Sequence, residues 1–156
     1  MRAPDRIEDL PPMLLAGLRR TYGFEASATG IPEAWKTFVD TLPLPGQVGG
    51  VTYGAVCGVD MEASTFEYMC AVEVGSFDGL DVATGRMKIP AAKYAVFLHH
   101  GPLADIRGTF ATGCEWLDAN GDWVDAHTPT FERYGPDFDQ ATGAGVEVWL
   151  PIVKAS

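Results

Sequence analysis

The chain presents the same order of sequence patterns twice, and this repeat limits the folds open to it more than any other feature. A strand-like run over residues 10–18 is followed by an amphipathic helical pattern and two further strand-like runs. The run over residues 89–98 opens a second round in the same order. The repeat is too long for a solenoid unit, so it predicts two pseudo-symmetric βαββ halves, about residues 10–74 and 86–153, in one domain over residues 1–156. We expect a ligand cleft where the halves meet.

The first half has the pattern of one strand, one helix and a strand pair. Residues 13–22 predict a strand, and apolar residues recur at helical spacing over residues 31–42. Pro and Gly residues end this helix, and residues 51–59 and 65–74 predict an antiparallel pair. Residues 75–85 are rich in Gly and Asp and predict a surface linker.

The second half repeats the pattern with a longer connection after its helix. Residues 88–99 predict a strand, and residues 103–117 predict a helix with one apolar face. Strands are expected at residues 131–134 and 146–153, separated by a loop rich in Gly, Pro and Asp. The two halves together predict an α+β fold with an antiparallel sheet and two helices.

The composition is acidic, with 21 Asp and Glu residues against 11 Lys and Arg residues and a formal net charge of −10. That charge repels nucleic-acid phosphates and anionic membranes, and it attracts cations. We therefore expect no direct nucleic-acid partner and no membrane partner. The N-terminal residues form no apolar signal region, and no run of about 18 apolar residues occurs, so a soluble cytoplasmic protein is expected.

The residue spacing predicts neither a metal site nor a cofactor. Cys57, Cys70 and Cys114 are odd in number and lack C-x-x-C spacing, which disfavours both a disulfide framework and a zinc site. His99 and His100 are adjacent, so their side chains point to opposite faces if the strand continues through them. The chain also lacks the Gly-rich strand-to-helix turn of a dinucleotide site and the Gly-x-Ser-x-Gly elbow of a hydrolase.

Several short motifs stand in an order that is typical of one family. They are Ile89-Pro90-Ala91, Tyr94-Ala95-Val96-Phe97, His100-Gly101, Glu115-Trp116-Leu117, Phe131-Glu132-x-Tyr134 and Val148-Trp149-Leu150-Pro151, with Trp35 and Tyr68 in the first half. With these motifs the chain resembles the GyrI-like effector-binding domains over nearly its whole length. Such domains are known as ligand-sensing halves of AraC-type and MerR-type multidrug regulators, as stand-alone proteins with gyrase-modulating activity, and as a branch that hydrolyses cyclopropane-bearing genotoxins.

The resemblance implies a sheet with its two helices on one side and an aromatic-lined ligand cleft on the other. It also implies a carboxylate in the cleft at the Phe-Glu-x-Tyr position, which is Glu132 here. Nothing before Leu10 or after Val153 is long enough for a helix-turn-helix module of about 50 residues. We therefore expect the stand-alone form of the family rather than a self-contained transcription factor.

Glu132 is the residue on which the functional hypothesis depends. Spacing alone favours an edge residue that points at solvent, whereas the resemblance implies that Glu132 lies in the cleft. A carboxylate in an aromatic cleft is costly to ionise unless a cation compensates it. Aromatic faces add a cation–π attraction of roughly 0.5 to 2 kcal/mol per contact, so flat lipophilic cations are the expected ligands.

The expected ligand-binding residues surround this carboxylate. Tyr68 shares a strand face with Phe66 and Cys70. Alternation alone allows Tyr68 to lie either in the core or in the cleft, and the resemblance favours the cleft. Phe97 is assigned to the cleft because Tyr94 shares its own strand face with a more core-like set. Trp149 lies opposite its aliphatic neighbours and Trp116 flanks the second helix, whereas Trp35 suits the core. The predicted ligand-binding set is Glu132, Tyr68, Trp149, Trp116, Phe97 and Tyr134.

Three functions remain open at this point. The first is a binding module that captures amphipathic, cationic aromatic molecules as a sensor or as a sequestering resistance protein. The second is a hydrolase of cyclopropane-containing genotoxins, with Glu132 as general base and Tyr68 as hydrogen-bond donor. The third is an interaction protein whose acidic surface engages gyrase or a separate regulator. Sequence does not distinguish a counter-ion from a base at Glu132.

Overall fold

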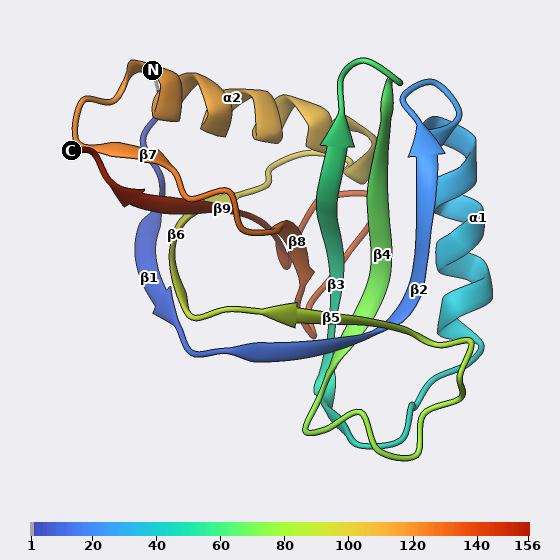
Figure 1. Ribbon diagram of the computed structural model, residues 1–156. Coiled ribbons are helices and arrows are strands. Elements are labelled where there is room, and N and C mark those ends of the chain that lie inside the picture. Colours follow the sequence, from blue (N-terminus) through green and yellow to red (C-terminus); the bar gives the residue numbers. More distant parts are fainter. Residues whose placement is uncertain (1) are drawn as a thin grey trace. The chain divides into compact units, whose positions relative to one another are not determined.

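Nine strands and two α-helices make up residues 2–156, the part of the chain that the computed structural model describes (Figure 1). The strand pairs are antiparallel, so the predicted α+β class with an antiparallel sheet and two helices is confirmed. The chain forms two compact units, one from residues 13–89 and the other from residues 2–12 and 90–156. Neither α-helix of residues 2–156 is long and apolar enough to cross a membrane.

The unit of residues 13–89 contains four strands in the order β3-β4-β2-β5 and one helix. Its elements are β2 (Met13–Gly23), α1 (Ser27–Val39), β3 (Gln47–Asp60), β4 (Thr65–Val74) and β5 (Gly85–Ile89). Helix α1 begins at Ser27, before the apolar pattern that predicted it, so Pro32 lies inside the helix. Because proline has no N–H to donate, this position loses one intrahelical hydrogen bond.

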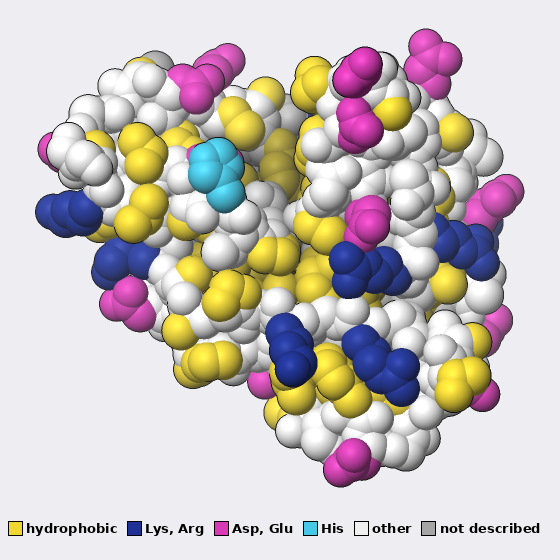
Figure 2. Space-filling model, viewed as in Figure 1, with side chains coloured by type: hydrophobic (Ala, Val, Ile, Leu, Met, Phe, Trp, Pro, Cys, Tyr) yellow, Lys and Arg dark blue, Asp and Glu magenta, His cyan; other side chains and the backbone are white. Residues whose placement is uncertain are grey.

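Strand β5 begins at the last residue of the predicted linker and pairs only with β2 in this unit. Arg86 and Lys88 are exposed and alternate with buried Met87 and Ile89. Figure 2 shows several Lys and Arg side chains gathered around β5. Charged side chains on an edge strand oppose pairing with other chains, so β5 has a protected edge.

The other unit contains four strands in the order β1-β6-β9-β8, with β7 also paired to β9. Its elements are β1 (Arg6–Leu10), β6 (Ala92–Leu98), a short 3₁₀ helix (Leu103–Asp105), α2 (Ile106–Ala119), β7 (Trp123–Asp125), β8 (Thr130–Tyr134) and β9 (Val146–Lys154). Strands β1 and β7 were not predicted. The predicted strand over residues 88–99 is in fact two strands, β5 and β6, with Pro90 between them.

The boundaries of the units differ from those of the predicted halves because strands are exchanged. The N-terminal strand β1 pairs with β6, which belongs to the second half of the sequence. Strand β5 precedes β6 directly in the chain, yet it pairs with β2 in the first half. The chain therefore passes from one unit to the other twice, at residues 12–13 and 89–90.

In each unit one face of the strands packs against the helix of that unit. In residues 13–89, Cys70 and Val72 of β4 pack with Ala34 and Phe38 of α1. In the other unit, Ala95, Phe97, Val148 and Leu150 pack with Ile106, Phe110, Trp116 and Leu117 of α2. These two clusters contain most of the apolar faces that the helical spacing predicted, but Val39 and Cys114, which the spacing placed on those faces, are exposed.

The opposite face of β6, β8 and β9 is also buried, and aromatic rings fill it. Phe131 stacks on Trp149 with 5.3 Å between ring centroids, and Tyr94 lies 5.0 Å from Phe131 and 5.8 Å from Trp149. Each of these three residues is at most 3% exposed. These three rings are therefore part of the buried core, on the face where the resemblance implied a ligand cleft.

Candidate functional site

Glu132 lies on the face of its unit that carries α2. In the antiparallel register Glu132 is opposite Val148, and Val148 is opposite Phe97. Residues directly opposite one another in antiparallel strands share a face. Since Phe97 and Val148 pack under α2, Glu132 belongs to the helix-bearing face. The resemblance had implied the opposite face, so that expectation is wrong.

The carboxylate of Glu132 is buried and hydrogen-bonded. The residue is 7% exposed, and the hydroxyl of Tyr134 donates to its Oε1 atom at 2.6 Å. Tyr134 follows two positions later on β8, so the strand places both side chains on one face. The neighbouring residue Arg133 points the other way, where its Nη1 lies 3.6 Å from Glu147 Oε1. The expectation from spacing alone, an edge carboxylate in solvent, is thus wrong.

Tyr134 in turn contacts the loop that follows β8. Its ring and that of Phe138 meet edge to face, with 5.0 Å between centroids and 68° between planes. The side chain of Tyr134 is 7% exposed, whereas Phe138 is 42% exposed. Glu132, Tyr134 and Phe138 therefore form a continuous series from a buried carboxylate to an exposed aromatic ring.

His99 is buried next to this series and has a structural role. Its N–H donates to the Val146 carbonyl, which places it in one row with Val146 and Tyr134. Its ring Nε2 lies 2.8 Å from the Pro102 carbonyl, and Nδ1 lies 2.7 Å from the Thr109 hydroxyl. A carbonyl only accepts, so Nε2 carries the proton and Nδ1 accepts from Thr109 in the neutral ring. The sequence suggested only a loop histidine at position 99. The hydrogen-bond partners of His99 come from a turn and from α2, and sequence spacing does not reveal that these approach it.

Phe97 and Trp116 pack against each other between β6 and α2. Phe97 is fully buried, and its ring centroid lies 6.0 Å from that of Trp116 in an edge-to-face arrangement. The prediction that Phe97 points away from the helices is wrong. The prediction assumed that the more apolar face of β6, which carries Tyr94 and Val96, packs against the helix. Both faces of β6 are buried, so this difference did not identify the face that the helix covers.

Tyr68 lies on the α1 face of the other unit. It is 3% exposed, and its hydroxyl accepts a hydrogen bond of 3.0 Å from Trp35 Nε1. Its strand neighbours Phe66 and Cys70 share that face, as alternation predicted. The helix, however, is on the same side, so the expectation that Tyr68 points away from the helices is wrong. Trp35 packs with the same cluster, in agreement with the core position expected for it.

Trp149 lies on the opposite face from Glu132 and stabilises the attachment of β1. Its indole N–H donates to Glu147 Oε1 at 3.1 Å, and the Arg6 guanidinium lies 5.4 Å above its ring. Arg6 also donates two hydrogen bonds to Glu147, at 2.8 and 3.1 Å. Burial alone would raise the pKa of Glu147, but the hydrogen bonds from Arg6 and Trp149 and the charges of Arg6 and Arg133 together lower it.

This ion pair predicts that β1 loosens in acid. A carboxyl whose folded pKa lies below its ordinary value of 4.5 contributes stability above that value and loses it as pH falls through the folded pKa. We expect Glu147→Gln to flatten the fall in unfolding free energy below about pH 4.5, measured by urea titration. The exposed helix residue Glu33 is the matched control, because Glu33→Gln removes the same charge without breaking an Arg6 contact. An unchanged pH profile in Glu147→Gln would contradict this role.

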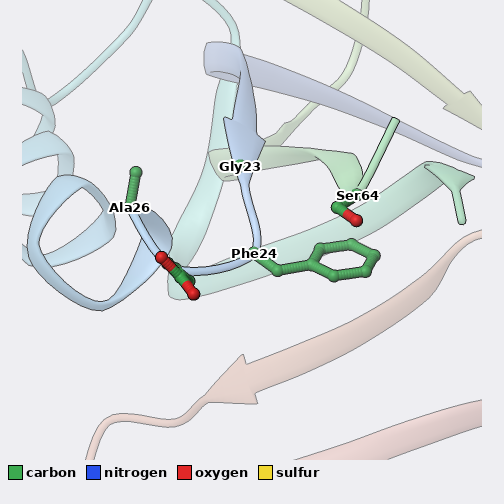
Figure 3. Close-up of a pocket in the computed structure, with 5 residues that line it drawn as sticks. Gly23, Phe24, Ala26 and Ser64 are labelled. Carbon is green, nitrogen blue, oxygen red and sulfur yellow. The ribbon is translucent and has the colours of Figure 1, made fainter. Parts of the chain in front are cut away.

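An open hollow of about 690 Å³ lies at the turn between β2 and α1 (Figure 3). It is lined by Gly23, Phe24, Glu25, Ala26 and Ser64. The backbone N–H of Phe24 donates to the Ser64 carbonyl at 2.9 Å, and Ser27 donates to the Phe24 carbonyl at 2.8 Å. These five lining residues include none of the predicted ligand-binding residues.

The described residues 2–156 include no group of three or more His, Cys, Asp or Glu side chains placed to hold a metal ion. Cys57 hydrogen-bonds to Glu67 at 3.5 Å, and Arg19 donates to its sulfur at 3.7 Å. Burial, the largest effect, raises the pKa of the Cys57 thiol. This thiol is therefore held in its protonated form rather than as a reactive thiolate.

The fold is similar to those of several solved structures. SAV2435, solved with tetraphenylphosphonium bound, has a TM-score of 0.74 and 20% identity, over 98% of this chain and 94% of that one. An integron cassette protein of Vibrio cholerae has a TM-score of 0.68 and 15% identity, over 95% of each chain. The EcmrR C-terminal domain has a TM-score of 0.66 and 15% identity, over 96% of this chain and 97% of that one. At such identities the likeness establishes the fold alone.

No protein of curated function matches the sequence. The sequence pattern of the GyrI-like small-molecule binding domain, however, matches residues 5–153, which include both helices and all the strands except the last residue of β9. It covers both units and the Glu132–Tyr134 pair. This chain belongs to the GyrI-like family of small-molecule binding domains.

Proposed function

We propose that this protein binds lipophilic organic cations and that the Glu132 carboxylate is their counter-ion. The observation that carries the proposal is the burial of Glu132, which is 7% exposed on the helix-bearing face and held by the Tyr134 hydroxyl. The formal net charge of −10 adds a long-range attraction for cations. The similar structure of SAV2435, which holds tetraphenylphosphonium, supports the same ligand class.

The energetics favour a delocalised cation over a compact one. Burying a carboxylate costs several kcal/mol after relaxation, and a nearby positive charge recovers part of that cost. A compact ammonium ion loses strong hydration when it enters such a site, whereas a large apolar cation loses much less. The ring of Tyr134, which is in contact with both Glu132 and Phe138, adds an aromatic surface beside the charge.

The test is the affinity for tetraphenylphosphonium, measured by isothermal titration calorimetry. Glu132→Gln keeps the shape of the side chain and removes its charge, so we expect affinity to fall roughly 10- to 100-fold, equivalent to about 1.5 to 3 kcal/mol for a charged partner. Glu115→Gln removes the same charge from an exposed position on α2 and should change affinity less than about twofold. Equal affinity in wild type and Glu132→Gln would reject the counter-ion role.

A second candidate uses the same carboxylate as a general base in the opening of a strained ring. One observation supports it: Tyr134, whose hydroxyl donates to Glu132 at 2.6 Å, supplies a proton donor beside the base. It would take the role expected for Tyr68, whose hydroxyl accepts from Trp35. Incubation of stoichiometric protein with a cyclopropyl-pyrroloindole, followed by mass spectrometry, separates the two functions. Product that disappears in Glu132→Gln would support the hydrolase, and no product would reject it.

A further inference from the structure

Phe138 is an exposed aromatic residue in a loop whose conformation is closely determined. Within the loop, Phe138 N–H donates to the Gly135 carbonyl at 3.1 Å and Asp139 N–H donates to the Ala144 carbonyl at 2.9 Å. Two more hydrogen bonds join the loop to the segment after β6, from Gly101 to Thr142 and from Leu103 to Gln140. The backbone position of Phe138 is thus fixed by hydrogen bonds at both ends of the loop.

Gly145 shows how tightly this loop is built. Its φ of +75° lies in the left-handed region, and a Cβ there would come within 2.6 Å of Asp137 Oδ1 and 2.8 Å of the Phe138 nitrogen. Only glycine fits these requirements without strain. The conformation that presents Phe138 therefore depends on a residue at the far end of the loop.

The exposure of Phe138 contrasts with that of the other rings in its unit. Phe97 and Phe131 are fully buried, whereas Phe138 is 42% exposed and meets the ring of Tyr134 edge to face at 5.0 Å. Tyr134 is the residue that donates to the Glu132 carboxylate. An apolar ring is thus presented to solvent within two side-chain contacts of a buried negative charge.

We propose that Phe138 is the specificity-determining residue that makes the Glu132 site prefer arylated cations over alkylated cations of the same charge. The proposal rests on the function proposed above. The ring of Phe138 can form edge-to-face and stacked contacts with an aryl group of the ligand, whereas an alkyl chain forms only apolar contacts with it. Glu132 attracts both kinds of cation through charge, and Phe138 distinguishes between them.

Two phosphonium ions with the same charged centre test the proposal: tetraphenylphosphonium and tetrabutylphosphonium. Phe138→Leu removes the ring and keeps an apolar side chain. We expect it to weaken tetraphenylphosphonium binding about three- to tenfold in calorimetric titration and to leave tetrabutylphosphonium binding within about twofold. Trp123→Leu is the matched control, because it removes a ring of the same unit that lies opposite Lys154 at the end of β9, away from Val148, the partner of Glu132; it should alter neither affinity.

The outcomes separate this proposal from the one on which it rests. Equal effects of Phe138→Leu on both ions, or no effect on either, would overturn the role of Phe138, while a loss of affinity in Glu132→Gln would still support the counter-ion. Wild-type protein that binds neither ion would overturn both proposals. Far-ultraviolet circular dichroism of each variant establishes that it is folded before it is titrated.

Discussion

Replacing Gly17 with alanine is expected to destabilise the protein by about 3 kcal/mol or more, which is at the upper end for overpacking of a filled interior. Gly17 lies in β2, between its pairing partners Ala71 on β4 and Gly85 on β5. A Cβ at this position would lie 1.9 Å from the Cys70 carbonyl oxygen and 2.9 Å from the Ala71 Cα. Both obstacles are backbone atoms, so the strands must separate to admit a methyl group. Urea unfolding followed by circular dichroism measures the loss.

Gly23 provides the matched control, because it lies at the end of the same strand and a Cβ there would meet nothing within 4 Å. Gly23→Ala should change the unfolding free energy by less than about 1 kcal/mol. A Gly17→Ala variant as stable as Gly23→Ala would show that β2 and β4 are less closely paired than the structure indicates.

Replacing Phe131 with alanine is expected to cost about 3 to 5 kcal/mol, because it leaves a cavity among buried rings. Phe131 is fully buried and stacks on Trp149 at 5.3 Å. If this face of the strands bound ligand, as the resemblance implied, removal of the ring would mainly reduce affinity. We expect the opposite, with most of the effect on the unfolding free energy.

Phe138→Ala is the comparison for this second experiment, since Phe138 is 42% exposed. Its unfolding free energy should change by no more than about 1 kcal/mol, although the same number of atoms is removed. Similar stability losses in the two variants would mean that the ring cluster of Phe131, Trp149 and Tyr94 is not the core described above.

Sequence patterns predicted the elements that bury a continuous apolar face. The predicted strand over residues 65–74 coincides with β4, and the predicted helices overlap α1 and α2. Strands β1 and β7 were missed and β5 was merged with β6, because these strands are short and carry charged residues such as Arg6 and Arg86. Edge strands of this kind are stabilised by the strand beside them, and local pattern does not reveal that partner.

The candidate site stays a prediction, but the structure places its central residue, Glu132, on the helix-bearing face rather than on the opposite face. The Phe-Glu-x-Tyr motif identified Glu132 and Tyr134, and alternation grouped Tyr68 with Phe66 and Cys70. Alternation shows which residues share a face, but it does not show which face a helix covers when both faces are buried. The assignments of Phe97 and Tyr68 were wrong for that reason, and Phe138 was missed because loop residues have no periodicity.

The pairing of the N-terminal strand β1 with β6 has a practical consequence for the design of fragments of this protein. A fragment that starts at residue 90 would keep Glu132 and Phe138 but would lack the strand that pairs with the outer edge of β6. An unpaired edge of that kind is a template for self-association, and Trp149 would also lose the guanidinium of Arg6. Restoring residues 6–10 to that fragment, as in a circular permutant, would return both the strand that pairs with β6 and the guanidinium of Arg6.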